Sequence, residues 1–89
     1  MGIDKLDYFV SAATHCNFTK AARDWGVAQS AISQQIASLE DDLDCVLFLR
    51  RGRSVILSRQ GQCFFEDAKR LQQMYQQAIE RARVLAEQI

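Results

Sequence analysis

The chain of 89 residues has no proline, a single histidine and only three cysteines, Cys16, Cys45 and Cys63. No two cysteines form a C-x-x-C pair, and an odd number argues against a disulfide scaffold. We therefore expect buried, reduced thiols, with a redox switch as the alternative. His15 has no cysteine or histidine at a spacing suited to zinc, so we expect neither a metal site nor a cofactor.

Long hydrophobic runs and catalytic motifs are also missing. No apolar run approaches the ~18 residues of a membrane span, and the N-terminus lacks a signal-peptide pattern. We expect a soluble, cytoplasmic protein without a membrane partner. There is no glycine-rich phosphate loop, and the adjacent Asp41 and Asp42 diverge on a helix. The sequence therefore predicts a protein that is not an enzyme.

Acidic residues are missing from one segment of the chain, although not from the chain as a whole. The 11 basic and 11 acidic residues give a formal net charge of zero. Between Cys45 and Phe65, however, four arginines occur without one acidic residue, whereas residues 40–44 contain four acids. Because the distribution of charge matters more than its sum, a nucleic-acid partner is not excluded.

The most informative stretch is Gln29–Leu43. Its large aliphatic residues follow one another at steps of four, three and four, which places them on one narrow stripe of a helix. The opposite face is small and uncharged at its start, so it can approach a partner closely. Upstream, Thr19–Ala22 and then Gly26 suggest a shorter helix closed by a left-handed glycine. This order predicts a helix-turn-helix over about 18–37, whose second helix enters the major groove of DNA.

Base recognition requires side chains that donate and accept hydrogen bonds at fixed positions. Glutamine can pair bidentately with adenine, serine can serve several bases, and an alanine methyl can meet thymine. The candidates in the first turns of the second helix are Gln29, Ser30, Ala31, Ser33 and Gln34.

Phosphate contacts are expected at two other places. Thr19 and Lys20 open the first helix of the pair, where backbone N–H groups can hold a phosphate, although capping alone also explains Thr19. Residues 49–57 predict a small β-hairpin, with an irregular basic loop as the alternative. Its Arg50, Arg51 and Arg53 are candidates for phosphate or minor-groove contacts, and Arg50 can instead anchor the hairpin against the helices.

Further helices complete the predicted core. We expect a first helix from an Asp4 cap to about Thr14, and a second one capped by Thr19. The positions expected to face inward are Leu6, Phe9, Val10, Ala13, Phe18, Ala21, Ala22 and Trp25.

The C-terminal segment from Arg59, capped by Ser58, predicts one long helix. Its apolar or small positions follow steps of four and three without interruption: Phe64, Ala68, Leu71, Tyr75, Ala78, Ala82, Leu85 and Ile89. A helix of this length outruns so small a domain and leaves its seam exposed. We therefore expect pairing with the same helix of a second copy, the alternative being a helix folded over its own domain.

These residues resemble the N-terminal region of LysR-type transcriptional regulators over nearly the whole chain. The resemblance rests on Leu6–Phe9, Phe18–Ala22, Val27–Ile36, Leu39–Glu40, Leu47–Phe48 with Arg50, Leu57–Ser58 and Gly61. It implies a winged helix-turn-helix followed by a long dimerising linker helix, with an effector-binding domain that is absent from this chain. Asp44 stands where the family usually has glycine; aspartate tolerates the left-handed conformation better than most residues, so we expect that turn to be retained.

Taken together, we expect a mainly α fold: a winged helix-turn-helix over 1–58 and a linker or dimerisation helix over 59–89. The predicted function is sequence-specific binding of double-stranded DNA at a near-palindromic operator by a homodimer, with higher oligomers in the full-length regulator. The alternatives are a helical protein–protein adaptor and an unrelated winged-helix family without the long C-terminal helix.

Overall fold

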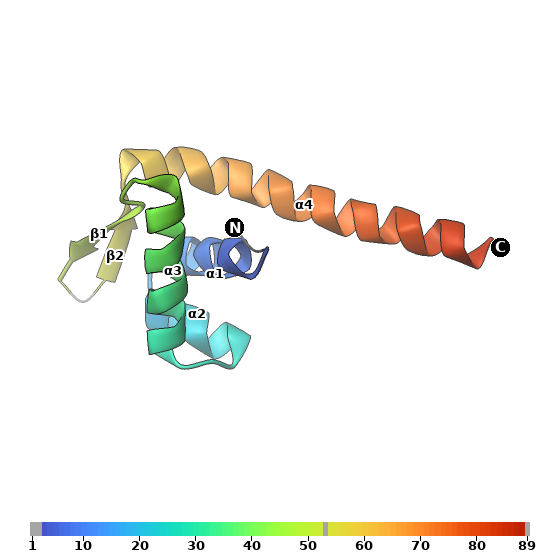
Figure 1. The fold of residues 1–89 in the computed structure, drawn as a ribbon. Helices are drawn as coiled ribbons and strands as arrows, with labels where there is room; N and C mark the ends of the chain where they lie inside the picture. Colours follow the sequence, from blue (N-terminus) through green and yellow to red (C-terminus); the bar gives the residue numbers. More distant parts are fainter. Residues whose placement is uncertain (1–2, 53, 89) are drawn as a thin grey trace.

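The computed structural model describes residues 3–52 and 54–88, and it contains four helices and one hairpin within these ranges (Figure 1). The predicted positions Arg53 and Ile89 lie outside the described residues. The observed order agrees with the predicted mainly α architecture with a small wing. Its elements are α1 (Ile3–His15), α2 (Phe18–Trp25), α3 (Gln29–Leu43), β1 (Phe48–Arg51), β2 (Ser54–Leu57) and α4 (Arg59–Glu87).

The core is centred on Phe9, whose side chain is fully buried. Its ring centroid lies 5.5 Å from that of Phe48, 5.2 Å from that of Phe64 and 6.3 Å from that of Phe65. Phe9 therefore joins α1 to both the wing and α4. Small residues fill the helix crossings, because a short side chain lets two backbones approach. The other buried apolar residues of this cluster are Leu6, Ala12, Ala13, Ala21, Ala22, Ile32, Ile36, Leu39, Leu47 and Ala68.

The helix ends follow local capping chemistry, with two corrections to the sequence prediction. Asn17, not Thr19, caps α2: its side-chain oxygen accepts a hydrogen bond from the Lys20 amide at 2.9 Å. The helix α1 already begins at Ile3, so Asp4 lies in its first turn instead of at its cap. Gly26 closes α2 in the predicted left-handed conformation, with φ of 64°.

Asp44 closes α3 in the same left-handed region, with φ of 53°. Its amide bonds to the carbonyls of Asp41 and Glu40, so the expected turn is retained without a glycine. The chain then reverses toward the wing. The Glu40 carboxylate fixes this reversal by accepting hydrogen bonds from the amides of Leu47 at 2.6 Å and Phe48 at 3.3 Å.

The predicted hairpin is present as an antiparallel pair with register Phe48↔Leu57 to Arg51↔Ser54. Ser58 then caps α4 as predicted, because its hydroxyl oxygen accepts from the Gly61 amide at 2.9 Å. The same hydroxyl donates to the Val46 carbonyl at 2.6 Å. One serine therefore ties the start of α4 to the segment that leads into the wing.

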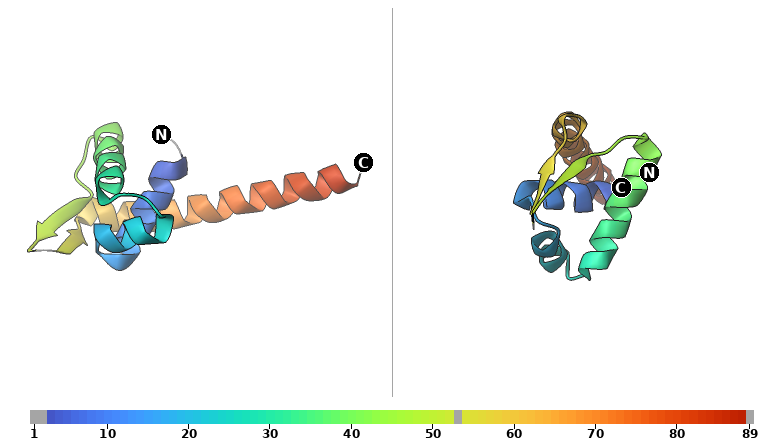
Figure 2. Two further views of the ribbon diagram at one scale, coloured as in Figure 1. Left: turned by 90° about the horizontal axis from the view of Figure 1, so that it is seen from below. Right: turned by 90° about the vertical axis from the view of Figure 1, so that its left-hand side faces the viewer.

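The helix α4 is 29 residues long, and only its first part lies on the body of the domain. Beyond that part it extends away from α1–α3, and the molecule measures 55 × 26 × 19 Å (Figures 1 and 2). Ala68 is fully buried in the chain's own core and Phe64 packs on Phe9, so the start of the predicted dimer seam has an intrachain role. Within the described ranges, no helix is long and apolar enough to cross a membrane.

Two further expectations were wrong. Trp25 is 45% exposed instead of facing inward, and its ring packs edge-on against Tyr8 with centroids 5.5 Å apart. The cysteines are not buried thiols, since Cys16 and Cys63 are exposed and Cys45 is half-buried.

Candidate nucleic-acid interface

The first turns of α3 present the predicted recognition residues on the outside of the molecule. Ile32, Ile36 and Leu39 are buried, and this stripe fixes the rotation of the helix about its axis. Gln29, Ser30 and Gln34 are exposed as a result, and Ala31 and Ser33 are half-buried. Figure 1 shows α3 at the edge of the body beside the hairpin, with its first turns near α2 and its last turn near α4.

The start of α2 is tied to the start of α3. Thr19 and Lys20 are both exposed, and the Thr19 hydroxyl donates to the Gln29 side-chain oxygen at 3.4 Å. The Lys20 amide is already engaged by the Asn17 cap, so Lys20 offers its ammonium group, and not its backbone, to an anion. The two helices can therefore present a positive charge and an amide side chain side by side.

The wing supplies the guanidinium groups. Arg50 and Arg51 are exposed, whereas Arg53 lies outside the described residues. The Arg50 Cζ lies 5.7 Å from the centroid of the Phe18 ring, a cation–π contact that anchors the hairpin against α2. This geometry supports the alternative that Arg50 anchors the hairpin against the helices. Because Arg50 is also exposed, its guanidinium remains accessible to an anion. A groove between α3 and the wing is lined by both Ser33 and Arg50.

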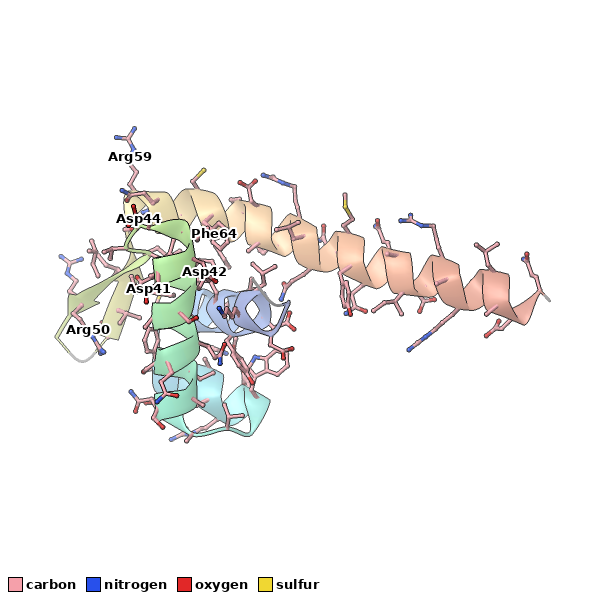
Figure 3. All side chains as sticks on the ribbon, in the orientation of Figure 1. Asp41, Asp42, Asp44, Arg50, Arg59 and Phe64 are labelled. Carbon is pink, nitrogen blue, oxygen red and sulfur yellow. The ribbon has the colours of Figure 1, made fainter. Side chains whose placement is uncertain are left out.

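The acidic residues lie at the opposite end of α3. Figure 3 shows Asp44 beside the start of α4, Asp42 and Asp41 below it on α3, and Arg50 out on the wing. The Lys5 ammonium donates to the Asp42 carboxylate at 2.9 Å. That hydrogen bond, helped by the Lys5 charge, holds the pKa of the Asp42 carboxyl below its ordinary value. The negative end of α3 is therefore separated along the helix from the candidate recognition residues.

Two features link the three predicted DNA-contacting regions. The Thr19–Gln29 bond joins α2 to α3, and the groove lined by Ser33 and Arg50 lies between α3 and the wing. The candidate dimerisation residues form a separate surface on α4. Among them, Leu71 is 42%, Tyr75 47% and Leu85 64% exposed, and Ala78 and Ala82 are exposed too.

Three contributors were missed in the sequence. Asn17 carried a recognisable signal, since asparagine is a preferred cap, but Thr19 two residues later carried the same signal. The other two are Phe18, whose ring contacts the Arg50 guanidinium, and Glu40, whose carboxylate accepts the backbone amides at the chain reversal. Both roles depend on tertiary contacts that no local pattern reveals. Within the described part of the chain, no group of three or more metal-ligating residues is gathered in one place.

The family described as "Bacterial regulatory helix-turn-helix protein, lysR family" matches residues 3–62. The glycine cleavage system transcriptional activator of Escherichia coli (strain K12) is 46% identical over 69 residues, covering 78% of this chain and 23% of that protein. The chain thus spans about a quarter of that relative's length.

Two similar solved structures are complexes with DNA. The CbnR_DBD–DNA complex has a TM-score of 0.92 and 35% identity, over 97% of this chain and 99% of that chain. The complex of BenM_DBD with catB site 1 DNA has a TM-score of 0.92 and 32% identity, over 97% of each chain. The similarity therefore includes the hairpin and the long C-terminal helix.

Proposed function

Because the chain belongs to the LysR family of bacterial regulatory helix-turn-helix proteins, we propose that it binds double-stranded DNA as the DNA-binding part of a transcriptional regulator. The observation that carries the proposal is the exposed, uncharged start of α3, next to cationic groups on α2 and the wing. A helix that enters the major groove needs this combination, because base edges are read at close range while phosphates flank the groove. The likeness to two DNA complexes supports it.

In the proposed complex, the first turns of α3 read base edges. Ser33 and Gln34 carry most of the discrimination, since their side chains can donate and accept hydrogen bonds. The Gln29 side chain accepts a hydrogen bond from Thr19, so its orientation is set in the absence of DNA. The remaining contacts on α3 are Ser30 and the Ala31 methyl.

Phosphate contacts position the domain without reading sequence. In the proposed set, Lys20, Arg50 and Arg51 are described and exposed, and Thr19 and Arg53 complete it. The wing arginines reach the backbone or the adjacent minor groove. This division assigns specificity to α3 and sequence-tolerant affinity to α2 and the wing.

The proposal includes a homodimer formed through α4. Its exposed residues Leu71, Tyr75 and Leu85 lie on one seam and leave apolar area in water that a second copy of the helix would cover. Two copies place two α3 helices in successive major grooves about one helical turn (~34 Å) apart, on a near-palindromic operator. In this division, residues 1–58 bind DNA and 59–89 dimerise. The proposal extends to a cytoplasmic location and to oligomers larger than the dimer.

Fluorescence anisotropy with labelled duplexes across about 50 to 300 mM salt tests the proposal. We expect log K to fall steeply with log salt and two chains to bind each duplex, because several cationic groups release counterions. Gln34→Ala should cost ~1–3 kcal/mol on a selected duplex and far less on a scrambled one. Arg51→Ala should weaken both duplexes and reduce the salt slope by about 1.

Gln62→Ala is the matched control for Gln34→Ala, because Gln62 is an exposed glutamine on α4. It should bind both duplexes like the unmodified chain. If the folded chain does not bind DNA at low salt, the proposal fails and a helical adaptor takes its place. Equal losses on selected and scrambled DNA for Gln34→Ala would remove the base-reading role from α3.

A further inference from the structure

The long helix α4 is held to the body by two different kinds of contact. Near its start, Phe64 packs on Phe9 and Ala68 is fully buried. One turn later, the Gln72 Nε2 donates to the Asp7 Oδ1 on α1 at 2.8 Å, in a half-buried position. Among the described residues, no side chain of α4 beyond Gln72 forms a hydrogen bond or ion pair with α1, α2 or α3.

The Asp7–Gln72 bond lies beyond the apolar contact at Ala68, where it resists a change in the direction of α4. The buried contact at Ala68 is apolar, and apolar contacts tolerate small rotations because they have no preferred direction. Gln72 is four residues further, about 6 Å along the helix at ~1.5 Å per residue. A swing of α4 by about 10° around Ala68 would move Gln72 by about 1 Å, enough to take a 2.8 Å bond out of hydrogen-bond range.

The same swing has a much larger effect at the far end of the helix. From Ala68 to Glu87 there are 19 residues, or about 28 Å. A rotation of about 10° displaces that end by about 5 Å, which exceeds the ~3.4 Å rise of one base pair. In a dimer joined through the free part of α4, the direction of each helix therefore sets the separation of the two α3 helices.

We propose that Asp7 and Gln72 are positioning residues that set the distance between the two half-sites the dimer accepts. The inference rests on the proposed DNA-binding dimer. Neither side chain touches DNA in this scheme: Asp7 is on α1, and both residues line the hollow between Trp25 and Tyr75 on the α4 side of the body. Their bond selects one direction of α4 from the range that the apolar contact allows. Spacing specificity thus has a source separate from base recognition by α3.

Selection of bound duplexes from a random library by the 89-residue chain tests the proposal, because the selected sequences themselves reveal the operator. The half-site motif and the spacing between paired half-sites are both read from them. The variants are Gln72→Ala, which removes the donor, and Asp7→Asn, which keeps an oxygen acceptor for Gln72. Gln62→Ala again serves as the exposed-glutamine control, and thermal unfolding checks that each variant is folded.

We expect the unmodified chain, Asp7→Asn and Gln62→Ala to select one dominant spacing. Gln72→Ala should select the same half-site motif with spacings spread over at least one base pair on either side. On defined duplexes, its preference for the dominant spacing over a neighbouring one should fall at least threefold, with unchanged affinity for a single half-site. A merely structural role would lower all affinities together.

Two results would overturn the inference, and they differ from each other. If Gln72→Ala keeps the single spacing of the unmodified chain, the bond does not set the separation, and the DNA-binding dimer stands. If the unmodified chain selects no paired half-sites, the proposed dimer on DNA fails and the inference fails with it.

Discussion

Replacing Gly61 by alanine should destabilise the fold, although alanine is the better helix former. Gly61 is buried in the first turn of α4, against the segment that leads into the wing. An added Cβ would lie 2.2 Å from the Leu47 carbonyl oxygen and 3.1 Å from Leu57 Cδ2. The first of these atoms is backbone, so no side-chain rotation relieves the contact. Either α4 or the segment before β1 must move.

The magnitude follows from the bonds that such a movement strains. The Leu47 carbonyl accepts the Ser58 amide at 2.8 Å, and the Ser58 hydroxyl donates to the Val46 carbonyl at 2.6 Å. Overpacking costs typically ~1–3 kcal/mol, and each weakened hydrogen bond adds about 1 kcal/mol. Alanine returns at most about 1 kcal/mol of helix propensity over glycine. The expected net loss is therefore about 2–4 kcal/mol in the free energy of unfolding.

Urea unfolding followed by far-ultraviolet circular dichroism measures this difference. The chains must be compared at one protein concentration, because dimerisation shifts the apparent stability. Gln62→Ala, at the exposed neighbouring position, should stay within about 0.5 kcal/mol of the unmodified chain. A Gly61→Ala chain that is more stable by about 1 kcal/mol, as helix propensity alone predicts, would refute the argument from close packing.

Three other predictions concern the caps and the acids. Asn17→Ala should cost ~1 kcal/mol in urea unfolding because it removes the cap of α2, and Thr19→Ala should cost clearly less; the reverse order would return the cap to Thr19. Glu40→Ala should lower the free energy of unfolding by ~1–3 kcal/mol, because it leaves two backbone amides without their acceptor, and Glu40→Gln should lower it less. Equal stability of Glu40→Ala and the unmodified chain would contradict this role of Glu40. The stabilisation from the Lys5–Asp42 pair should be present at neutral pH and lost as the pH falls below 3.8 through the lowered pKa of Asp42. The melting temperatures of Asp42→Asn and the unmodified chain should therefore differ at neutral pH and converge in acid. A difference that persists in acid would assign the effect to something other than the charge.

Local chemistry was enough to predict the elements that carry the candidate site. The steps of four and three in Gln29–Leu43 fix both the helix and its buried face, and Ile32 and Leu39 are buried accordingly. Turn and cap residues with a strong intrinsic preference were also predictable. Gly26 adopts the left-handed conformation that the lack of a Cβ permits, and the Ser58 hydroxyl caps α4.

Two kinds of feature were not predictable: which of two suitable residues caps a helix, and which apolar side chains remain at the surface. Asn17 and Thr19 are both good caps, and the local pattern does not distinguish them. In the structure Asn17 is the cap, directly before Phe18, whose ring lies 5.2 Å from that of Phe48. Trp25 is apolar, but the turn at Gly26 leaves it at the surface beside Tyr8. Cysteine spacing likewise carries no information about exposure.

The contacts that cross between elements, in the candidate site and at the base of α4, were the least visible in the sequence. The Arg50–Phe18 contact joins residues 32 positions apart, and the Asp7–Gln72 bond joins residues 65 positions apart. No periodicity links such positions. The recognition face of α3 could be predicted because it is the complement of a buried stripe, whereas the supports of the wing and of α4 required coordinates.

The separation of charge along α3 and the wing gives a neutral molecule a permanent electric dipole. With 11 positive and 11 negative residues, the domain feels little net attraction toward DNA at long range. In the proposed complex with DNA, the field of the phosphates exerts a torque on this dipole, which favours the orientation with the wing arginines toward the duplex and the Asp41–Asp44 end away from it. For the proposed function, the separated charges therefore favour the productive orientation at short range, where the net charge of zero contributes nothing.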